Sequence, residues 1–467
     1  MKTGITAIIN QNGDEEGLAR TVNSVAGWTS EIVVVKQGRG TSGRKISGWF
    51  LGLNSGEEVS IPLKREIRTL FEELKKVPGR NNPDAYLIPI IRNTGDTWKL
   101  VCKGSARLFF AGGKGITGTL ANPIRDYLTH KSFPDIRASV RIRRILVVKL
   151  RGIGDTVLLT PLFKALKKSF KGVLIDAVVR KESASLLSGH TNISTAIAYE
   201  GFFRTLLKLR RNKYDIALVS QASFRSALLA RLSGAKLLSV NNHNGRNYFS
   251  SVRVKKPQEY ENAAERDLDC LRAFGLKAQF SQPKISVSAD EQKKARALLI
   301  KYGARKNTKV IIINPSASKR NKIWPEKSFS LLVDKISSEK NVKVLLLADP
   351  ANSVSSAITA SLAKSEPVLL PLLGLREVLG LLSVAALYIG NDSGLSHAAA
   401  ALGTATITIV GPDEPVIFHP YKEGQGHYLV SKDRFCKPCW KENCEGRECL
   451  EIIKPADVYK EYLKWKK

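Results

Sequence analysis

The sequence predicts an α/β protein built from two Rossmann-like domains that face each other across a ligand. This prediction depends on two strand–loop–helix turns and on the alternation of strands and helices around them. The apolar run 145–149 leads into the glycine-bearing turn 150–155, and the apolar run 384–389 leads into the turn that starts at Gly390. Short apolar runs are typical of buried strands. Open parallel sheets bind ligands outside the carboxyl ends of such strands.

The turn after Gly390 has the features of a phosphate site. Asp392 or Ser393 is expected to cap a helix that runs through the alanines 398–401 and ends at Gly403. Free N–H groups and the positive end of the helix dipole at such a start favour an anion. An ordinary capped helix without a ligand is the alternative from this segment alone.

The turn at 150–155 carries two glycines that let the backbone come close to a ligand. A helix is expected to open at Thr156 and to continue through Leu166. The third glycine of a dinucleotide fingerprint is missing. Because Asp155 ends the turn that follows the strand 145–149, it is expected at the mouth of the same kind of crevice. Two such turns on successive α/β units indicate a ligand between two domains.

Three blocks follow along the chain. Residues 1–135 are expected to form a small α/β domain, 144–288 an N-terminal Rossmann-like domain and 289–467 a C-terminal one, with a basic linker at 136–143. The elements expected in these blocks are strands at 3–9, 31–35, 172–179, 214–220, 309–314, 343–348 and 407–411, and helices at 15–25, 226–233, 290–302 and 455–466. The last helix is amphipathic and is expected to cross back onto the second block.

Composition indicates a globular protein with an affinity for anions. The chain has 467 residues, of which 43% are hydrophobic and 25% charged, and a net charge of +32. The apolar runs are strand-sized and no signal peptide opens the chain, so a cytoplasmic protein is expected. Because no nucleic-acid motif accompanies the charge, an anionic membrane surface is favoured over nucleic acid. A lysine-rich solubilising surface is the alternative.

A cysteine array stands near the C-terminus. Cys436, Cys439, Cys444 and Cys449 form a C-x2-C-x4-C-x4-C pattern. Four thiols at this spacing can close a tetrahedral zinc site, and reduced thiols, disulfides or an iron–sulfur cluster are the alternatives. The two other cysteines, Cys102 and Cys270, are expected to be small buried residues.

The first block resembles the start of family-two glycosyltransferases. Its opening strand 5–10, the helix 18–25 and the strand 31–35 match that pattern. Where the family has a nucleotide-binding aspartate this chain has 36–38, Lys-Gln-Gly, and where the metal-binding Asp-x-Asp belongs it has Asn54-Ser55-Gly56. A divalent metal ion that bridges a sugar diphosphate needs hard carboxylate oxygens close together, and this segment does not supply them. The block is therefore expected to be a degenerate, non-catalytic module.

Blocks two and three together resemble glycosyltransferase family 9, the ADP-heptose:lipopolysaccharide heptosyltransferases. The resemblance covers about residues 144–460 and rests on five ordered motifs, which are 146–161, 212–215, 314–318, 322–325 and 391–415. It implies the GT-B architecture, with the donor nucleotide bound mainly by the C-terminal domain and the acceptor by the N-terminal one. It also implies that catalysis needs no metal.

The resemblance assigns roles to residues. Asp155 takes the place of the catalytic base, Lys322 that of the phosphate-binding lysine, and Gly154 and Arg151 lie on the acceptor side. The remaining donor-binding candidates are Ser316, Ser318, Asp392 as the cap of the loop, Ser393, Gly394, Leu395 and His397. The chemistry agrees, because an inverting transfer needs a carboxylate base and positive charge on the departing diphosphate. The structural alternatives are an N-cap role for Asp155 and a packed helix position for His397. Trp324 is expected in the core.

The resulting functional prediction is an inverting, metal-independent glycosyltransferase that moves heptose from ADP-heptose to a lipopolysaccharide core acceptor. Its expected partners are the nucleotide-sugar donor, a lipid-linked saccharide acceptor and the anionic surface of the inner membrane, on whose cytoplasmic face it would be peripheral. Another nucleotide-diphosphate sugar as donor, or a non-catalytic protein that binds sugar nucleotides or glycolipids, are the alternatives. Nucleic acid is not expected as a partner.

Overall fold

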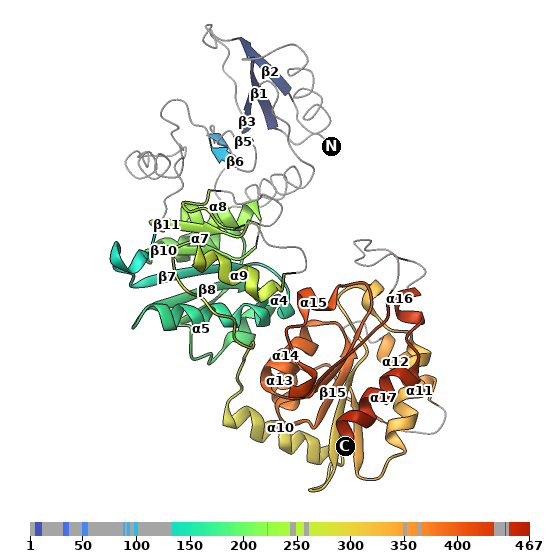
Figure 1. Cartoon of the computed structure of the whole chain (residues 1–467). Helices are drawn as coiled ribbons and strands as arrows, with labels where there is room; N and C mark the ends of the chain where they lie inside the picture. The colour runs from blue at the N-terminus through green and yellow to red at the C-terminus, as the bar shows by residue number, and fades with distance from the viewer. Residues whose placement is uncertain are drawn as a thin grey trace. The chain divides into compact units, whose positions relative to one another are not determined.

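A computed structural model gives the fold of the chain (Figure 1). It describes residues 133–467 except for 222, 243–248, 256–260, 349–352, 363–366, 434–443 and 445–447, and before residue 133 it describes the backbone of six strands. Those strands are β1 (Ile5–Gln11), β2 (Glu31–Lys36), β3 (Trp49–Asn54), β4 (Leu87–Ile88), β5 (Ile91–Asn93) and β6 (Trp98–Leu100). β2, β1, β3 and β4 form a parallel sheet in that order, which confirms the strands expected near 3–9 and 31–35. The helix expected at 15–25 lies outside the described residues.

The second sheet has Rossmann strand order. It runs β11-β10-β7-β8-β9, which counted from its own first strand is 5-4-1-2-3. Its strands are β7 (Arg144–Lys149), β8 (Leu174–Arg180), β9 (Thr195–Tyr199), β10 (Ile216–Val219) and β11 (Leu237–Val240). Its helices are α4 (Ile153–Leu158), α5 (Thr160–Ser169), α6 (Lys181–Ala184), α7 (Phe202–Arg210), α8 (Phe224–Leu232) and α9 (Ala263–Arg272).

The third sheet shows the same order with one more strand. It runs β14-β13-β12-β15-β16-β17, and every neighbouring pair is parallel. The strands are β12 (Lys309–Asn314), β13 (Val342–Leu346), β14 (Val368–Leu369), β15 (Leu387–Asn391), β16 (Ala405–Val410) and β17 (His427–Ser431). The strand order reverses between β12 and β15, and in such folds ligands bind at this point.

Helices cover both faces of the third sheet. In Figure 1, α13 (Leu375–Val384) and α14 (Gly394–Leu402) lie on one side of β15, and α11 (Glu326–Ser337), α12 (Val354–Ala360) and α17 (Pro455–Lys466) lie on the other. The further helices are α10 (Ala289–Lys301), α15 (Pro415–Phe418) and α16 (Glu448–Glu451). The strand expected at 384–389 begins later than predicted. Val384 is the last residue of α13, and β15 begins at Leu387.

The last helix does not cross back onto the second block, so that expectation was wrong. α17 packs on α11, β16 and β17. Val458 and Tyr462 lie fully buried in the core of the third sheet, and the Tyr462 hydroxyl donates to Glu339, two residues after the end of α11, over 2.9 Å. The apolar face of α17 thus completes the core of its own sheet. Trp324 is fully buried in the same core, as predicted.

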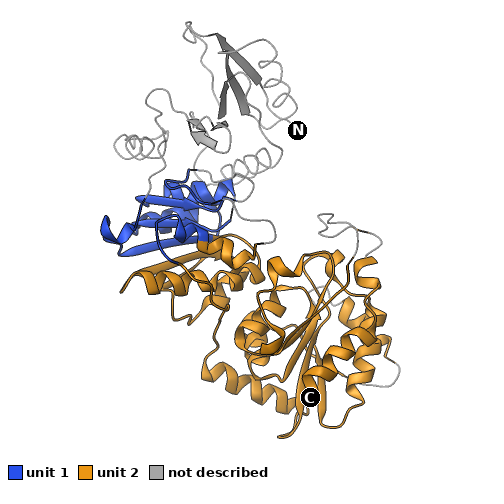
Figure 2. Cartoon of the chain, viewed as in Figure 1, with its two compact units in different colours: residues 1–148, 199–257, 269–277 blue, residues 149–198, 258–268, 278–467 orange. Residues whose placement is uncertain are grey.

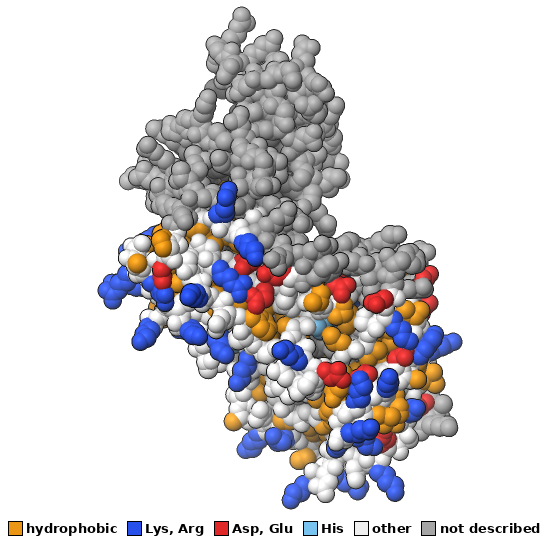
Figure 3. Space-filling view, viewed as in Figure 1, with side chains coloured by type: hydrophobic (Ala, Val, Ile, Leu, Met, Phe, Trp, Pro, Cys, Tyr) orange, Lys and Arg blue, Asp and Glu red, His pale blue; other side chains and the backbone are white. Residues whose placement is uncertain are grey.

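The chain divides into two compact units (Figure 2). One contains residues 1–148, 199–257 and 269–277, and the other contains 149–198, 258–268 and 278–467. On the face drawn in Figure 3, lysine and arginine side chains are spread over the described surface and do not gather in one patch. Among the described helices, none combines the length and apolarity needed to cross a bilayer.

Candidate functional site

The start of α14 presents backbone N–H groups at the carboxyl end of β15. Ser393 is the N-cap in extended conformation, and its own amide donates to the Ser396 hydroxyl over 3.3 Å. The helix ends at Gly403 with φ 86°, as the sequence predicted. Asp392 does not cap this helix, so the role expected for it as the cap of the loop was wrong. Its carboxylate instead accepts hydrogen bonds from the side chains of Lys322 and His419.

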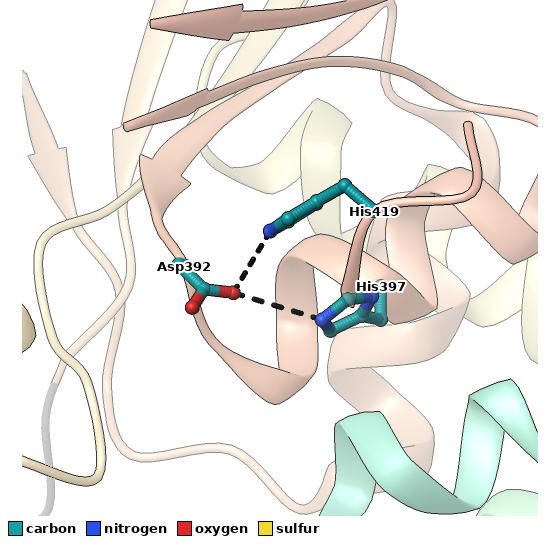
Figure 4. A group of neighbouring side chains, drawn as sticks. All are labelled: Asp392, His397 and His419. Atoms are coloured by element: carbon teal, nitrogen blue, oxygen red, sulfur yellow. Dashed lines mark hydrogen bonds and ion pairs between the residues drawn. The ribbon is translucent and has the colours of Figure 1, made fainter. Parts of the chain in front are cut away.

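Asp392 is the centre of a buried polar cluster, and only 4% of its side chain is exposed. One carboxylate oxygen, Oδ2, accepts a hydrogen bond from Lys322 Nζ over 2.7 Å. The other, Oδ1, accepts from His419 Nε2 over 3.0 Å and lies 3.6 Å from His397 Nε2 (Figure 4). The rings of His397 and His419 are stacked with centroids 4.9 Å apart. Residues from three separate segments therefore meet on one carboxylate.

These contacts fix the charge of the cluster. Burial by itself would raise the pKa of Asp392, but the contacts with the two histidines and the charge of Lys322 hold that pKa well below its usual value. Burial lowers the pKa of His397 in spite of the carboxylate, which favours its neutral form. Burial also acts to lower the pKa of Lys322, but two neighbouring carboxylates raise it above the usual value. Lys322 is thus a permanent cation at this site.

The second carboxylate on Lys322 is that of Asp413. Lys322 Nζ makes a short ion pair with Asp413 Oδ2, and the two side chains are 18% and 23% exposed. Asp413 lies between the end of β16 and the start of α15. Burial raises the pKa of Asp413, and the nearby Asp392 carboxylate raises it further, whereas the charge of Lys322 lowers it. The ammonium is therefore shared by two carboxylates that come from different loops.

One group of described residues has donor atoms close enough together for a metal ion. The ligand atoms of Asp392, His397 and His419 all lie within 4.8 Å of one another. Lys322 already places a positive charge on the same carboxylate, and a divalent cation beside it would be repelled. We therefore interpret the group as a hydrogen-bonded cluster rather than as a metal site.

The carboxyl end of β12 is hydrogen-bonded to β15. Asn314 Nδ2 donates to the Tyr388 hydroxyl over 3.1 Å, and Asn314 Oδ1 accepts from the Ser316 hydroxyl over 2.9 Å. Gly390 allows this approach, because a Cβ there would lie 2.6 Å from the Asn314 carbonyl oxygen. Burial raises the pKa of Tyr388 to about 12, so its hydroxyl stays protonated. Ser316 is half-buried in this network, whereas Ser318 is exposed.

The turn that contains Asp155 contacts the start of α14. A Cβ on Gly154 would lie 2.8 Å from His397 Cδ2, and a Cβ on Gly394 would lie 2.7 Å from Ile153 Cβ. The two loops that the sequence singled out are thus brought together, with a glycine from each at the contact. Gly154 meets the His397 ring directly, and this ring is 5% exposed, so the packed-helix alternative for His397 describes its surroundings correctly.

The helix after this turn begins earlier than predicted. α4 starts at Ile153 with Gly152 as its N-cap, and a second helix, α5, starts at Thr160. Asp155 therefore lies within the first turn of α4, and both the expected start at Thr156 and the alternative N-cap role of Asp155 were wrong. Its side chain is half-buried, and within the described part of the chain its carboxylate has no hydrogen bond or ion pair. Arg151 is exposed on the same turn.

Two residues of the cluster, His419 and Asp413, were not predicted as site residues from the sequence. Both follow β16, at the same sheet edge as the carboxyl end of β15. The apolar run that forms β16 followed by Gly-Pro-Asp-Glu-Pro was the signal that could have located them, because parallel neighbours end at one edge.

The cysteine array is only partly within the described residues. Cys436 and Cys439 lie outside them, whereas Cys444 is half-buried and Cys449 is 7% exposed beside Leu450 in the core of the third sheet. Cys270 is fully buried, as predicted, and Cys102 lies outside the described residues.

Comparisons with known proteins extend these observations. Lipopolysaccharide heptosyltransferase 3 of Escherichia coli is 25% identical over 327 residues, which cover 66% of this chain and 95% of that protein. Lipopolysaccharide heptosyltransferase 1 of Campylobacter coli is 25% identical over 287 residues, 57% of this chain and 84% of the relative. The chain is thus similar to these proteins over most of their length.

Solved structures are similar to the same part of the chain. A glycosyl transferase of family 9 from Veillonella parvula superimposes with a TM-score of 0.61 at 20% identity, and covers 70% of this chain and 98% of the other. The ADP-heptose lps heptosyltransferase II of E. coli superimposes with a TM-score of 0.58 at 21% identity, over 69% and 98%. Two Rossmann-type sheets with this likeness define an α/β protein of the GT-B class, as predicted.

The family follows from a sequence match. The family model described as glycosyltransferase family 9 (heptosyltransferase) matches residues 202–449, more than half of the chain. The chain belongs to this family, and it is therefore a glycosyltransferase. The resemblance found from the motifs alone is confirmed.

Proposed function

We propose that this protein transfers heptose from ADP-heptose to a lipopolysaccharide core acceptor, with inversion at the anomeric carbon and without a catalytic metal ion. The relatives named above carry the names of lipopolysaccharide heptosyltransferases. The observation that carries the proposal is the contact of α4 with α14, which sets the turn of Asp155 beside the Ser393–Leu395 amides. A candidate base and a candidate diphosphate site are thereby neighbours, as a direct displacement requires.

Asp155 is the proposed base. An acceptor hydroxyl must lose its proton as it attacks the anomeric carbon, and a carboxylate in reach of that hydroxyl accepts it. A carboxylate without hydrogen-bond donors among the described residues is available for this role. Gly154 is the acceptor-side glycine that lets this turn pack against the His397 ring, and Arg151 on the same turn is the proposed partner of an anionic acceptor group.

The donor diphosphate is proposed to bind at the start of α14. The amides of Gly394 and Leu395 would donate to its oxygens, and the amide of Ser393 would join them on leaving the Ser396 hydroxyl. Lys322 would neutralise the charge that develops on the leaving group. Ser316 and Ser318, on the loop after β12, are proposed to bind phosphate or ribose. Asp392 and His397 would act on the donor mainly by holding Lys322 and the start of α14 in place.

The protein is proposed to work in the cytoplasm at the inner face of the inner membrane, where a lipid-linked acceptor would be found. A net charge of +32 supports attraction to an anionic surface. Binding to vesicles of anionic and of zwitterionic lipid, compared at low and high salt, tests this part. Equal binding to both kinds of vesicle would contradict it.

A structural zinc ion on the four cysteines is also retained as a proposal. Cys436, Cys439, Cys444 and Cys449 supply the thiolate number that such sites use. Metal analysis of the purified protein before and after chelation tests it, with a Cys436→Ser, Cys439→Ser double variant as the comparison.

The test of the main proposal is a transfer assay with ADP-heptose and a panel of truncated lipopolysaccharide acceptors in EDTA. We expect transfer by the wild type and a fall of about 100- to 10,000-fold in Asp155→Ala, because a general base is lost. ADP binding should be unchanged in this variant. Glu182→Ala removes an exposed carboxylate of the same unit and serves as the control.

Three other outcomes would change the proposal. Nucleotide binding without turnover on any acceptor would favour another donor or a non-catalytic role. Full activity of Asp155→Ala would contradict the assignment of the base but not the family. Transfer only after a divalent cation is restored would contradict metal independence.

A further inference from the structure

Lys322 is already neutralised by carboxylates where a diphosphate is proposed to bind. Its Nζ contacts Asp392 Oδ2 and Asp413 Oδ2. Two negative charges thus face one positive charge, so the immediate surroundings of the ammonium repel an incoming anion. A donor that carries a diphosphate therefore binds Lys322 more favourably if one of the two carboxylates withdraws.

Asp392 is held too firmly to be the carboxylate that withdraws. It is 4% exposed at the end of β15, and its amide donates to Ile409 in the neighbouring strand over 2.9 Å. Its other oxygen accepts from His419 over 3.0 Å. Withdrawing the Asp392 carboxylate would leave the buried His419 Nε2 without its acceptor, which is costly.

Asp413 is placed differently. It lies on the short turn between β16 and α15, and nearly a quarter of its side chain is exposed. Rotation of this side chain would carry its carboxylate toward water, where a negative charge is well solvated. Asp413 is therefore the group that can leave Lys322 at the lower free-energy cost.

We infer that Asp413 is an internal competitor of the donor: in the free protein its carboxylate occupies the place of a donor phosphate on Lys322, and it withdraws when the nucleotide diphosphate binds. This inference rests on the proposed function, because it takes Lys322 to be the phosphate-binding lysine. Asp413 then weakens the binding of the donor and of the nucleoside diphosphate product alike. Its return to Lys322 helps to expel the product.

The test is the affinity of the full-length protein for ADP, measured by calorimetry in EDTA so that no divalent cation bridges the carboxylates. We expect Asp413→Asn and Asp413→Ala each to bind ADP about tenfold more tightly than the wild type, because the competing charge is gone. Glu414→Gln is the matched control. It removes one negative charge from the next residue, and its affinity should stay within about twofold of the wild type.

A second readout separates competition from a change in folding. In the transfer assay, ADP should inhibit Asp413→Asn at about a tenth of the concentration that inhibits the wild type, in proportion to the affinity gain. Thermal unfolding of both Asp413 variants without ligand verifies that the protein is folded.

Two results would overturn the inference. If the wild type binds ADP and neither Asp413 variant binds it more tightly, Asp413 does not compete, although the proposed function stands. If neither the wild type nor the variants bind ADP, both the inference and the proposed donor site are wrong. A variant that binds ADP more weakly would make Asp413 a direct ligand of the nucleotide and would also contradict competition.

Discussion

Single glycines set how closely the two candidate loops approach. Gly154 on α4 and Gly394 on α14 each face a neighbour that a Cβ would meet at less than 3 Å. The atoms they face belong to the buried His397 ring and to the branched side chain of Ile153, neither of which can move away freely. The close contact of α4 with α14 therefore depends on the absence of a side chain at both positions.

We expect Gly154→Ala to lower the free energy of unfolding by about 1–3 kcal/mol, because the added methyl group overpacks a buried contact. Gly154 has helical backbone geometry, so the effect would not come from a forbidden conformation. Gly152→Ser is the control, since a Cβ on Gly152 meets no atom within 4 Å and serine is a favourable N-cap. Denaturation by urea measures both variants. An equal loss in the two would contradict the packing explanation.

The site residues that could be predicted are those that lie close together in one short sequence motif. The Asn-Asp-Ser-Gly motif and the following histidine identified Asp392, Ser393 and His397, because a strand end and a helix start have local signatures. The two residues that were not predicted have no such signature. His419 and Asp413 come from a later loop and reach Asp392 and Lys322 only through the pairing of β15 with β16.

Arg376 ties several segments together at the level of elements. It lies on α13, and its guanidinium donates to Glu291 on α10 over 2.7 Å and to the carbonyl oxygens of Ser286 and Ser185 over 3.2 and 3.4 Å. Hydrogen bonding to Arg376 lowers the pKa of Glu291 to about 2. One side chain thus fixes α10, α13 and the segment before α10 in one arrangement.

This ion pair predicts a pH dependence of stability. The pKa of Glu291 is lower in the folded than in the unfolded protein, so its contribution is complete above about pH 4.5 and is lost as the pH falls toward about 2. Arg376→Met should destabilise the protein by about 1–3 kcal/mol at pH 7 and progressively less below pH 4.5. Urea denaturation between pH 3 and 7 measures this difference.

Lys294→Met is the matched control for this prediction. It breaks the exposed pair of Lys294 with Asp290 on the same helix, and such pairs contribute little to stability. A difference between Arg376→Met and the wild type that does not shrink in acid would show that Glu291 is not the titrating partner.

Seven of the eleven strands described after residue 143 were predicted from apolar periodicity, whereas β9, β11, β14 and β17 and more than half of the helices were not. The strand β12 and the helix α17 have the predicted bounds. What periodicity could not show is which surface an apolar face covers. The apolar face of α17 was predicted to pack on the second block for this reason, whereas it packs in the core of the third sheet. The start of α4 was also missed, because Gly152 as N-cap and Ile153 give no clear helix signal in sequence.

At the scale of the whole molecule, the site residues all come from the part that resembles family 9. The E. coli relative is covered over 95% of its length by 66% of this chain, and the first candidate site residue is Arg151. The residues just before this part pack against it. Ile136 is fully buried and its amide donates to Phe274 over 3.1 Å, so residues expected as a linker are packed.

We therefore expect a chain that begins at residue 131 to retain ADP binding and transfer. A chain that begins at residue 140 should be less stable, because it loses the buried Ile136 and the contact of Phe133 with Phe274. Loss of about 2–5 kcal/mol is expected for removing one large buried aliphatic side chain. Thermal unfolding and calorimetry with ADP compare the two. Loss of ADP binding in the longer chain would show that the first block takes part in the site.

The adjacency of β12 and β15 has a consequence for how this protein can change over evolutionary time. Asn314 pairs with Gly390, so the loops that carry Lys322 and Asp392 start from neighbouring strands although some seventy residues separate them along the chain. The buried elements of the intervening segment, such as β13 and α11, belong to the core and are constrained by it, but the loops between them can lengthen or shorten without altering the spacing of the two loops. Insertions there should be tolerated, whereas a single-residue slip of β15 against β12 would separate the ammonium from its carboxylate.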